Sequence, residues 1–292
     1  DRSGTTFLAG LLAQHSGVLM PPESQFKRDV NLSDLDKFNV EKHKKILLES
    51  WRFKNWFDNV EFLKNISNDC TYQEFYEILV SKYSLDTYGT SKVEFWVDHT
   101  PENLEYFPMF DSLFDDLSYI HIVRDGRAVA ASIKGLEWGP NTPKSMADFW
   151  IEKLSYGFAC EASSTNKVLR VKYEDLVQNT EVELARIIEF IKLKSEVENG
   201  KIIKLPSFTQ NQHSLVGKKP NTSRVNRWMD QLSDFEINTF EYYTHSMLHI
   251  LGYKPKQEYY SPSKLLLFRD ILIEIIKKQM NKFSYEKARR IK

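Results

Sequence analysis

The sequence has little cysteine, no net charge and no long apolar run. Its 292 residues contain two cysteines, Cys70 and Cys160, too few for a disulfide framework or a cysteine-rich metal site. Forty basic residues balance forty acidic ones, so no overall field favours nucleic acid as a partner. No apolar stretch is long enough to cross a bilayer, and the usual spacings of metal ligands are missing. These features argue against a disulfide-stapled scaffold and a polybasic nucleic-acid binder, and this sequence contains no membrane-spanning segment.

The charge is nevertheless distributed unevenly. The segment 263–292 carries nine Lys or Arg and three Asp or Glu, a net of +6. This composition predicts a basic amphipathic helix over 261–292, separate from a domain over 1–260. Such a helix can lie on an anionic membrane surface, or it can pack its apolar face on the domain or on another subunit. The apolar residues that share one helical face are Leu265, Phe268, Leu272, Ile275, Ile276 and Phe283.

Strand-like and helix-like patterns alternate along residues 1–260. Strands are expected over 93–98, 118–123 and 167–172, and helices over 5–15, 71–84, 128–136, 143–164 and 181–192. This alternation predicts an α/β fold with a parallel sheet between two helical layers. The segment 33–67, rich in charge and aromatic residues, is expected to form a helical insertion. Ligands in such folds bind outside the carboxyl ends of the strands, so the loops at those ends should converge.

The first loop, residues 1–6 with the sequence DRSGTT, opens an apolar helical segment. Backbone N–H groups at a helix start attract anions, and Gly4 lets an oxyanion approach the backbone closely. Arg2 adds a planar fork of donors that fits phosphate or sulfate, and Thr5 or Thr6 can cap the helix. An ordinary capped helix is the alternative. Because such a loop normally follows a buried strand, we expect a first strand ahead of Asp1.

A second anion-binding pattern follows the strand over 118–123. Arg124 ends this strand, where an unpaired buried cation would be costly. Ser132 lies two helical turns further on, so both side chains can face one anion. The alternative is a salt bridge from Arg124 to a carboxylate with Ser132 as a small packing residue. We interpret Arg127 as a surface or helix-start charge.

These motifs together resemble the sulfotransferase family, whose members use 3′-phosphoadenosine 5′-phosphosulfate (PAPS). The resemblance rests on residues 1–8, on 122–127 with Ser132, and on 171–176. The closing segment over 217–233 and the tripeptide 251–253 add to it. The pattern is nearer to the carbohydrate and tyrosyl-protein branches than to the cytosolic small-phenol branch. The resemblance implies a P-loop-like sulfotransferase fold, truncated at the 5′-phosphosulfate loop.

The resemblance also implies a nucleotide site and no metal. Two positions depart from the family pattern: Asp1 stands where an anion is unusual, and His99 stands where lysine is common. The donor-binding residues that the resemblance implies are Arg2, Ser3, Gly4, Thr5, Thr6, Arg124, Ser132, Tyr173 and Lys218.

The implied reaction is in-line transfer of a sulfuryl group from PAPS to an acceptor hydroxyl, which requires a base. Glu23, held in a loop stiffened by two prolines, is the candidate; a structural salt bridge is its alternative role. His99 is the rival base, or it stabilises the bridging oxygen, and Arg2 is the cation on the transferred group. The expected acceptor is a glycan or glycolipid, which Trp51, Trp56 or Trp138 could stack on, although core packing is commoner.

Two other functions stay open. One is a nucleotide kinase or NTPase, although the full G-x-x-x-x-G-K-[ST] pattern is missing. The other is a non-catalytic module that binds nucleotides or membranes. Low cysteine content and a composition rich in Lys, Ile, Asn and Phe favour a bacterial cytoplasmic protein over a Golgi-lumenal one.

Overall fold

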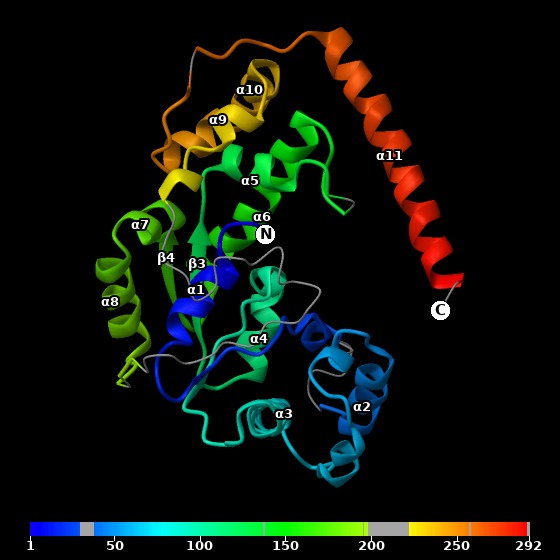
Figure 1. Cartoon of the computed structure of the whole chain (residues 1–292), viewed down its shortest axis with the longest axis vertical. Helices are drawn as coiled ribbons and strands as arrows, with labels where there is room; N and C mark the ends of the chain where they lie inside the picture. Colours follow the sequence, from blue (N-terminus) through cyan, green and yellow to red (C-terminus); the bar gives the residue numbers. More distant parts are fainter. Residues whose placement is uncertain (30–37, 137, 195, 198–221, 257, 291–292) are drawn as a thin grey trace.

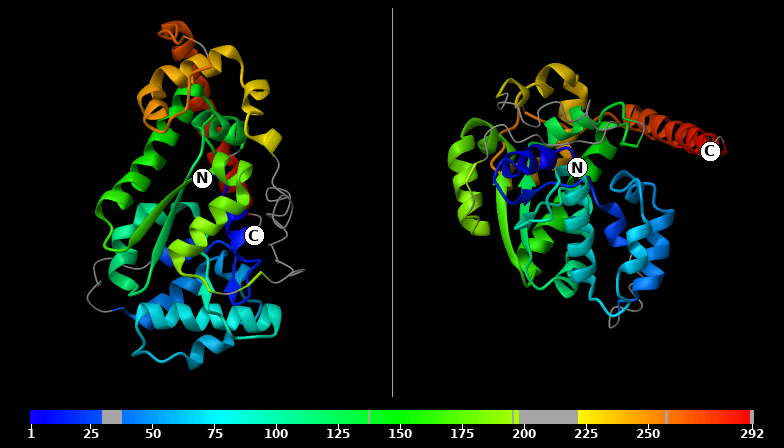
Figure 2. Two further views of the ribbon diagram at one scale, coloured as in Figure 1. Left: turned by 90° about the vertical axis from the view of Figure 1, so that its left-hand side faces the viewer. Right: turned by 60° about the horizontal axis from the view of Figure 1, so that its bottom comes forward.

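The computed structural model describes residues 1–29, 38–136, 138–194, 196–197, 222–256 and 258–290. Their α/β arrangement is shown in Figure 1, and two further views are given in Figure 2. In chain order the elements are α1 (Thr5–Leu12), β1 (Val18–Leu19), η1 (Gln25–Arg28), α2 (Val40–Glu49), η3 (Phe53–Asn55), η4 (Glu61–Asn65), α3 (Tyr72–Tyr88), β2 (Phe95–Trp96), η5 (Pro101–Tyr106), α4 (Phe107–Leu113), β3 (Ser118–Val123), α5 (Gly126–Ile133), α6 (Pro143–Ser163), β4 (Lys167–Lys172), α7 (Tyr173–Gln178), α8 (Thr180–Ile191), η7 (Thr222–Arg224), α9 (Trp228–Gln231), α10 (Asp234–Ile250) and α11 (Lys264–Arg290).

The described strands form two parallel pairs. β3 pairs with β4 over the predicted ranges, in a register that sets Val123 opposite Lys172. β1 pairs with β2, and this second pair is shorter than the strand predicted over 93–98. Pro21 and Pro22 follow β1 closely, and proline has no backbone N–H with which to extend a ladder. The α/β class with parallel strands is thus confirmed.

Helices cover both faces of the β3–β4 pair. Buried His121 lies against α6, where an added Cβ at Gly157 would stand 2.2 Å from the imidazole ring. Only glycine allows the helix to come this close to the strand. On the other face, Ile122 shares a core with Leu8 of α1 and Ile187 of α8. β3 is therefore largely buried on both faces, which explains why it reads as an almost continuous apolar run, whereas β4 is only partly buried.

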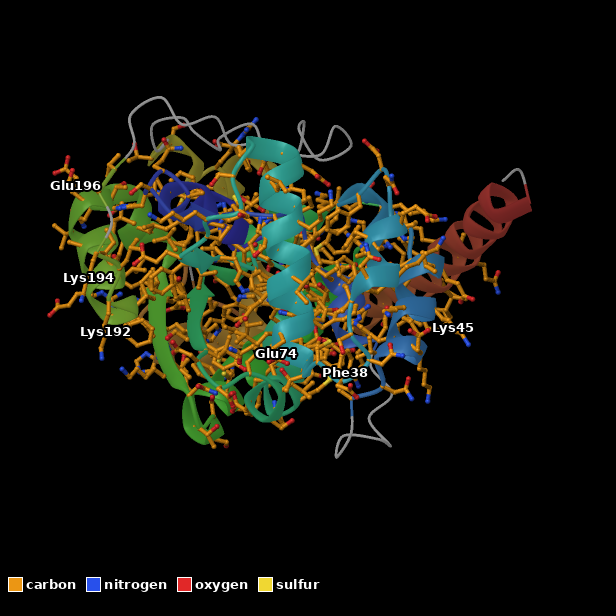
Figure 3. The ribbon with its side chains drawn as sticks, turned by 90° about the horizontal axis from the view of Figure 1, so that it is seen from below. Phe38, Lys45, Glu74, Lys192, Lys194 and Glu196 are labelled. Carbon is orange, nitrogen blue, oxygen red and sulfur yellow. The ribbon has the colours of Figure 1, made fainter. Side chains whose placement is uncertain are left out.

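In the segment predicted as a helical insertion, the described residues from 38 onward contain α2 and the short helices η3 and η4. It shares an aromatic core with η1, α3 and α4. Within this core, Phe26 makes edge-on contacts with Phe53 and Trp56, at centroid distances of 5.3 and 5.4 Å. α3 begins at a capping box formed by Thr71 and Glu74. Seen from below, α3 runs between the α8 edge, marked by Lys192 and Lys194, and the α2 segment (Figure 3).

The basic C-terminal segment forms α11, which extends away from the sheet (Figure 1). It is joined to the domain by its polar residues: Glu274 accepts hydrogen bonds from the Asn141 N–H and the Ser145 hydroxyl, at 3.1 and 3.0 Å. Leu266, Leu267 and Ile273 are partly buried. The described residues of the predicted apolar face are exposed instead, so the expectation that this face packs on the domain is wrong for them. No helix among the described residues is long and apolar enough to span a membrane. The exposed apolar residues are Leu265, Phe268, Ile271, Leu272, Ile275 and Ile276.

Candidate active site

The loop over 1–6 leads into α1 through left-handed backbone. Arg2 has a φ of 59° and Gly4, the N-cap of α1, has a φ of 98°. The N-cap has no side-chain hydrogen bond, so the expectation that Thr5 or Thr6 caps this helix is wrong. Both threonines lie within its first turn. The N–H groups of this turn therefore have no side-chain cap, and a helix start of this kind favours an anion.

Tyr173 forms the floor under this loop. It directly follows β4 and is buried. A Cβ added to Gly4 would stand 2.5 Å from the Tyr173 ring, and no other residue adopts a φ of 98° easily. The Arg124 guanidinium lies over the same ring, 4.4 Å from its centroid. The register of β3 and β4 explains why Arg124 contacts Tyr173, because each residue directly follows the end of one of the two paired strands.

Two arginines meet beside the loop. Arg124 donates from Nη1 to the carbonyl oxygen of Arg2 at 2.8 Å, while its Nε is buried without a hydrogen-bond partner in the described chain. Arg2 donates from Nε to the Ser132 hydroxyl at 3.0 Å. Burial and the nearby Arg124 charge both lower the pKa of Arg2. A buried donor without a partner next to a second cation indicates a site that an anion would complete.

The salt-bridge interpretation of Arg124 is wrong for the described residues, since none of their carboxylates pairs with its guanidinium. Ser132 bonds Arg2 rather than only filling space. The Ser3 hydroxyl lies 3.5 Å from the Asp1 carbonyl oxygen, within the loop. Lys218 lies outside the described residues.

On the other side of α1, His99 follows β2. Its Nδ1 lies 3.4 Å from the Thr6 hydroxyl, and its Nε2 is buried without a hydrogen-bond partner among the described residues. Burial lowers the pKa of His99, although the neighbouring Asp98 opposes this effect. The lowered pKa favours the neutral imidazole, which has one N–H donor and one acceptor nitrogen.

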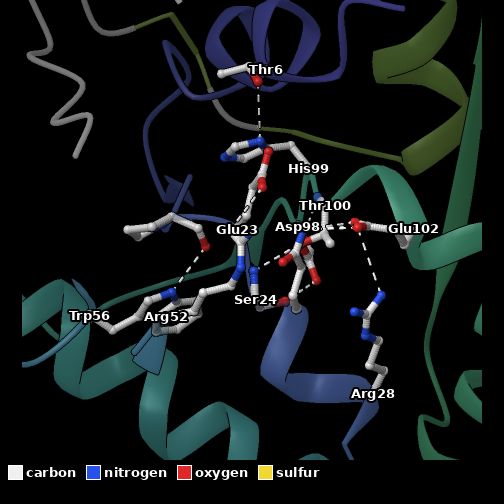
Figure 4. A network of polar contacts seen from close by, with 12 residues as sticks. Thr6, Glu23, Ser24, Arg28, Arg52, Trp56, Asp98, His99, Thr100 and Glu102 are labelled. Atoms are coloured by element: carbon white, nitrogen blue, oxygen red, sulfur yellow. Dashed lines mark hydrogen bonds and ion pairs between the residues drawn. The ribbon is translucent and has the colours of Figure 1, made fainter. Parts of the chain in front are cut away.

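Glu23 lies in the same network (Figure 4). Its carboxylate is 3.5 Å from Nη1 of Arg52, and its side chain is 23% exposed. Burial raises the pKa of Glu23 to about 7, although the Arg52 charge opposes this rise. A carboxylate with that pKa is suited to take a proton from a hydroxyl near neutral pH. In the view of Figure 4 the side chain extends toward His99 and the start of α1.

Two anchors hold the Glu23 loop in place. On one side, the Trp56 indole donates to the Pro22 carbonyl oxygen at 3.1 Å. On the other side, Ser24 donates through its N–H to the Thr100 hydroxyl at 2.8 Å, and through its own hydroxyl to Asp98. The buried neighbour Lys27 pairs with the same Asp98 carboxylate at 2.5 Å. This lysine and the surrounding donors hold the pKa of Asp98 well below its usual range, despite burial.

Sequence reasoning missed Arg52, Asp98 and Lys27, because their partners are distant in the chain. It interpreted Arg127 as a surface or helix-start charge: the residue does lie at the start of α5, but it is buried rather than at the surface. Arg127 pairs with Asp125 at 2.7 Å and with Glu241 at 2.5 Å, and it therefore joins α5 to α10. The ion pair with Asp125 could have been predicted from the sequence. An aspartate at a helix N-cap is within reach of a guanidinium two residues later in the chain.

Among the described residues, no group of three or more His, Cys, Asp or Glu is placed to hold a metal ion. The groups brought together are instead cations, uncapped N–H groups, hydroxyls and one carboxylate of raised pKa. They can bind an anion on one side of the α1 start and accept a proton on the other.

Comparison with known proteins identifies the family. Residues 1–197 match a sequence model described as the sulfotransferase family. The chain is 37% identical over 100 residues to Cytosolic sulfotransferase 12 of Arabidopsis thaliana, covering 30% of each chain. It is 24% identical over 273 residues to Nodulation protein NoeE of Sinorhizobium fredii, covering 82% of this chain and 60% of that protein. The chain thus spans less than two thirds of the length of either relative.

The fold is also shared with solved structures. The sulfotransferase domain of the Synechococcus PCC 7002 olefin synthase superposes with a TM-score of 0.55 at 19% identity, covering 87% of this chain and 92% of that domain. The sulfotransferase domain of the curacin biosynthetic pathway gives a TM-score of 0.54 at 16% identity, covering 87% and 95%. The family match spans α1 to α8 and includes every described residue of the anion site and of the Glu23 loop. The chain therefore belongs to the sulfotransferase family.

Proposed function

We propose that this protein transfers a sulfuryl group from PAPS to a hydroxyl of a glycan or glycolipid. The observation that carries the proposal is the arrangement around α1. Two arginines unpaired with described carboxylates lie on one side, and Glu23 with a pKa of about 7 lies on the other. Sulfuryl transfer, like phosphoryl transfer, depends mainly on positioning and charge stabilisation.

The donor would be held by the chain's own cations and N–H groups. The first turn of α1 and Arg2 bind the phosphosulfate end, and Arg124 with Ser132 bind the 3′-phosphate. Tyr173 supports Gly4 and Arg124 from below. The unpartnered Nε of Arg124 and the uncapped start of α1 fit a ligand with two anionic groups. Lys218 stays a prediction as a further phosphate contact.

In the reaction, Glu23 accepts the proton of the acceptor hydroxyl. The acceptor oxygen then forms a bond to sulfur while the bond from sulfur to the phosphate oxygen breaks, and adenosine 3′,5′-bisphosphate leaves. Arg2 stabilises the charge that develops on the leaving oxygen. We assign His99 to the same oxygen rather than to proton abstraction, in the tautomer that accepts a hydrogen bond from the Thr6 hydroxyl at Nδ1 and carries its proton on Nε2.

The first test is donor binding by calorimetry, followed by transfer of labelled sulfate from PAPS to an acceptor panel. Arg124→Ala should weaken binding of adenosine 3′,5′-bisphosphate at least tenfold, since a charge-assisted hydrogen bond contributes about 1.5–3 kcal/mol. Lys144→Ala, at an exposed ion pair with Asp148 on α6, is the control. Failure to bind the bisphosphate, or binding that Arg124→Ala leaves unchanged, would refute the proposal.

The same experiment separates the alternatives. Magnesium-dependent ATP hydrolysis without sulfate transfer would indicate a nucleotide kinase or NTPase. Tight nucleotide binding without transfer to any acceptor would indicate a non-catalytic module.

We also propose that α11 allows peripheral contact with an anionic membrane, in a bacterial cytoplasmic protein. The described residues of its predicted apolar face are exposed, and basic residues such as Arg269 and Lys277 lie on the same helix. A helix with these properties can rest at a lipid surface. Sedimentation with vesicles containing phosphatidylglycerol, compared with Leu272→Glu, tests this contact. Equal sedimentation of both proteins would contradict it.

A further inference from the structure

Asp98 connects the loop that carries Glu23 to the loop that carries His99 (Figure 4). Asp98 directly precedes His99 in the chain, and Ser24 directly follows Glu23. The two oxygens of the Asp98 carboxylate serve different loops. Oδ2 accepts a hydrogen bond from the Ser24 hydroxyl at 2.5 Å, whereas Oδ1 accepts from the N–H and the hydroxyl of Thr100 at 3.0 and 2.6 Å. One planar carboxylate therefore bridges the two loops.

The Thr100 hydroxyl adds a second connection. It donates to Asp98 and accepts from the Ser24 N–H at 2.8 Å, so it bonds both loops at once. Ser24 is 1% exposed and Thr100 is 5% exposed. Hydrogen bonds in a buried and satisfied network of this kind make the local structure rigid. The backbone next to Glu23 and the backbone next to His99 are therefore held by the same network.

Lys27 allows Asp98 to be buried and fixes it to the aromatic core. Its ammonium group donates to Asp98 Oδ2 at 2.5 Å and lies 4.2 Å from the Phe110 ring centroid. Its carbonyl oxygen accepts from the Tyr72 hydroxyl at 2.5 Å, and both aromatic residues belong to the core shared by α3 and α4. A carboxylate has about four lone-pair positions, and these donors occupy them. Asp98 is therefore suited to placing other groups rather than to contacting a substrate.

We propose that Asp98 is a positioning residue that fixes Glu23 and His99 relative to each other, at the separation that sulfuryl transfer requires. This inference rests on the proposed function, in which Glu23 faces the acceptor oxygen and His99 faces the leaving oxygen. In-line transfer keeps these oxygens on opposite sides of the sulfur atom, and a displacement of about 1 Å can lower the rate roughly 10²-fold. The described hydrogen bonds of Arg2 and Arg124 lead elsewhere. The Asp98 network should therefore affect kcat rather than donor affinity.

The test uses the hydroxyl groups of the network, because removing Asp98 would leave the buried Lys27 charge without its partner. Thr100→Val should lower kcat for sulfate transfer at least tenfold, while the affinity for adenosine 3′,5′-bisphosphate changes less than twofold. Ser24→Ala, a smaller perturbation, should show the same split. Thr100→Ser should retain most of the wild-type kcat, because it keeps the hydroxyl group.

The matched control is Thr244→Val. It removes a buried hydroxyl that donates to the Phe240 carbonyl oxygen within α10 at 2.7 Å, and it should leave kcat unchanged. The inference would be overturned by a loss of kcat below tenfold in either Thr100→Val or Ser24→Ala, whichever folds, or by an equal loss in Thr244→Val. A parallel loss of bisphosphate affinity, or an inactive Thr100→Ser, would also overturn it.

An NMR measurement separates this inference from the proposed function. The readout is the pair of nitrogen signals of the His99 imidazole in the protein saturated with adenosine 3′,5′-bisphosphate. Ser24→Ala should shift these signals although Ser24 lies in the other loop, whereas Thr244→Val should leave them in place. If the wild-type protein binds the bisphosphate but transfers no sulfate, the proposed function alone fails, and a shift in Ser24→Ala still supports the positioning role. Unmoved His99 signals in Ser24→Ala would overturn that role whether or not sulfate is transferred.

Discussion

The central prediction concerns Glu23→Gln. The substitution keeps the size of the side chain and removes the titratable carboxyl group. If Glu23 is the base, transfer should fall by about 10²- to 10⁴-fold, the usual contribution of a positioned proton acceptor. The wild-type rate should also depend on pH. With a pKa of about 7, the ionised fraction rises about tenfold between pH 6 and pH 8, and kcat/KM should rise with it.

The same substitution should stabilise the folded protein at alkaline pH. The pKa of Glu23 is raised from 4.5 to about 7 by burial, so between these values the folded state binds more protons than the unfolded state. The free energy of unfolding therefore falls as pH rises through this window. A shift of that size corresponds to about 3 kcal/mol. This is an upper bound for the gain in Glu23→Gln, because Arg52 loses its ionic partner.

The assays are kcat/KM from pH 5.5 to 8.5 and thermal unfolding over the same range. The expected result is an inactive variant whose Tm exceeds that of the wild type by several degrees at pH 8 and equals it near pH 4.5. Glu77→Gln, an exposed site on α3, is the control and should change neither quantity. A variant that retains a tenth of the activity, or a Tm difference that does not vary with pH, would refute the assignment.

Two further substitutions test the two sides of the site. Gly4→Ala should weaken binding of adenosine 3′,5′-bisphosphate at least tenfold in calorimetry. The new Cβ would stand 2.5 Å from the Tyr173 ring, and the φ of 98° is strained for alanine. Unchanged affinity would show that the loop does not hold the nucleotide. Arg52→Gln should raise the pKa of Glu23 further, since the Arg52 charge lowers it. The acid limb of the kcat/KM profile should then move to higher pH, and an unmoved limb would contradict the role assigned to Arg52.

The sheet and the anion loop were largely predictable from sequence, for a local reason. β3 is mostly buried, β4 is partly buried, and both contain β-branched residues; their bounds at 118–123 and 167–172 agree with the structure. Parallel strands that end in register bring together the residues that follow them, and the meeting of Arg124 and Tyr173 follows from this rule. The start of α1 was less predictable, because Gly4 rather than a threonine occupies the N-cap.

The environment of Glu23 could not be predicted. Its pKa is raised by burial and lowered by the charge of Arg52, which lies 29 residues further along the chain. Two prolines predicted a stiff loop, but nothing local shows that the Trp56 indole fastens it. Arg127 illustrates the same limit, since Glu241, its ion-pair partner, is on α10. Pairs formed across such sequence distances leave no periodic pattern.

The positions of Arg2 and Glu23 near the start of α1 lead to a last prediction, which concerns the pKa of Glu23 when the donor is bound. Burial lowers the pKa of Arg2 and raises that of Glu23. Both side chains are therefore poorly solvated in the free enzyme. A bound donor adds negative charge beside Arg2 and near Glu23. This charge should favour the protonated form of Glu23 and raise its pKa above 7.

Since kcat/KM for PAPS reports the free enzyme and kcat reports the complex, the acid limb of kcat should lie at higher pH than that of kcat/KM. A high-salt buffer should narrow the gap, because salt screens partly exposed charges. Coincident limbs at low salt would mean that the donor binds too far from Glu23 for this carboxylate to be the base.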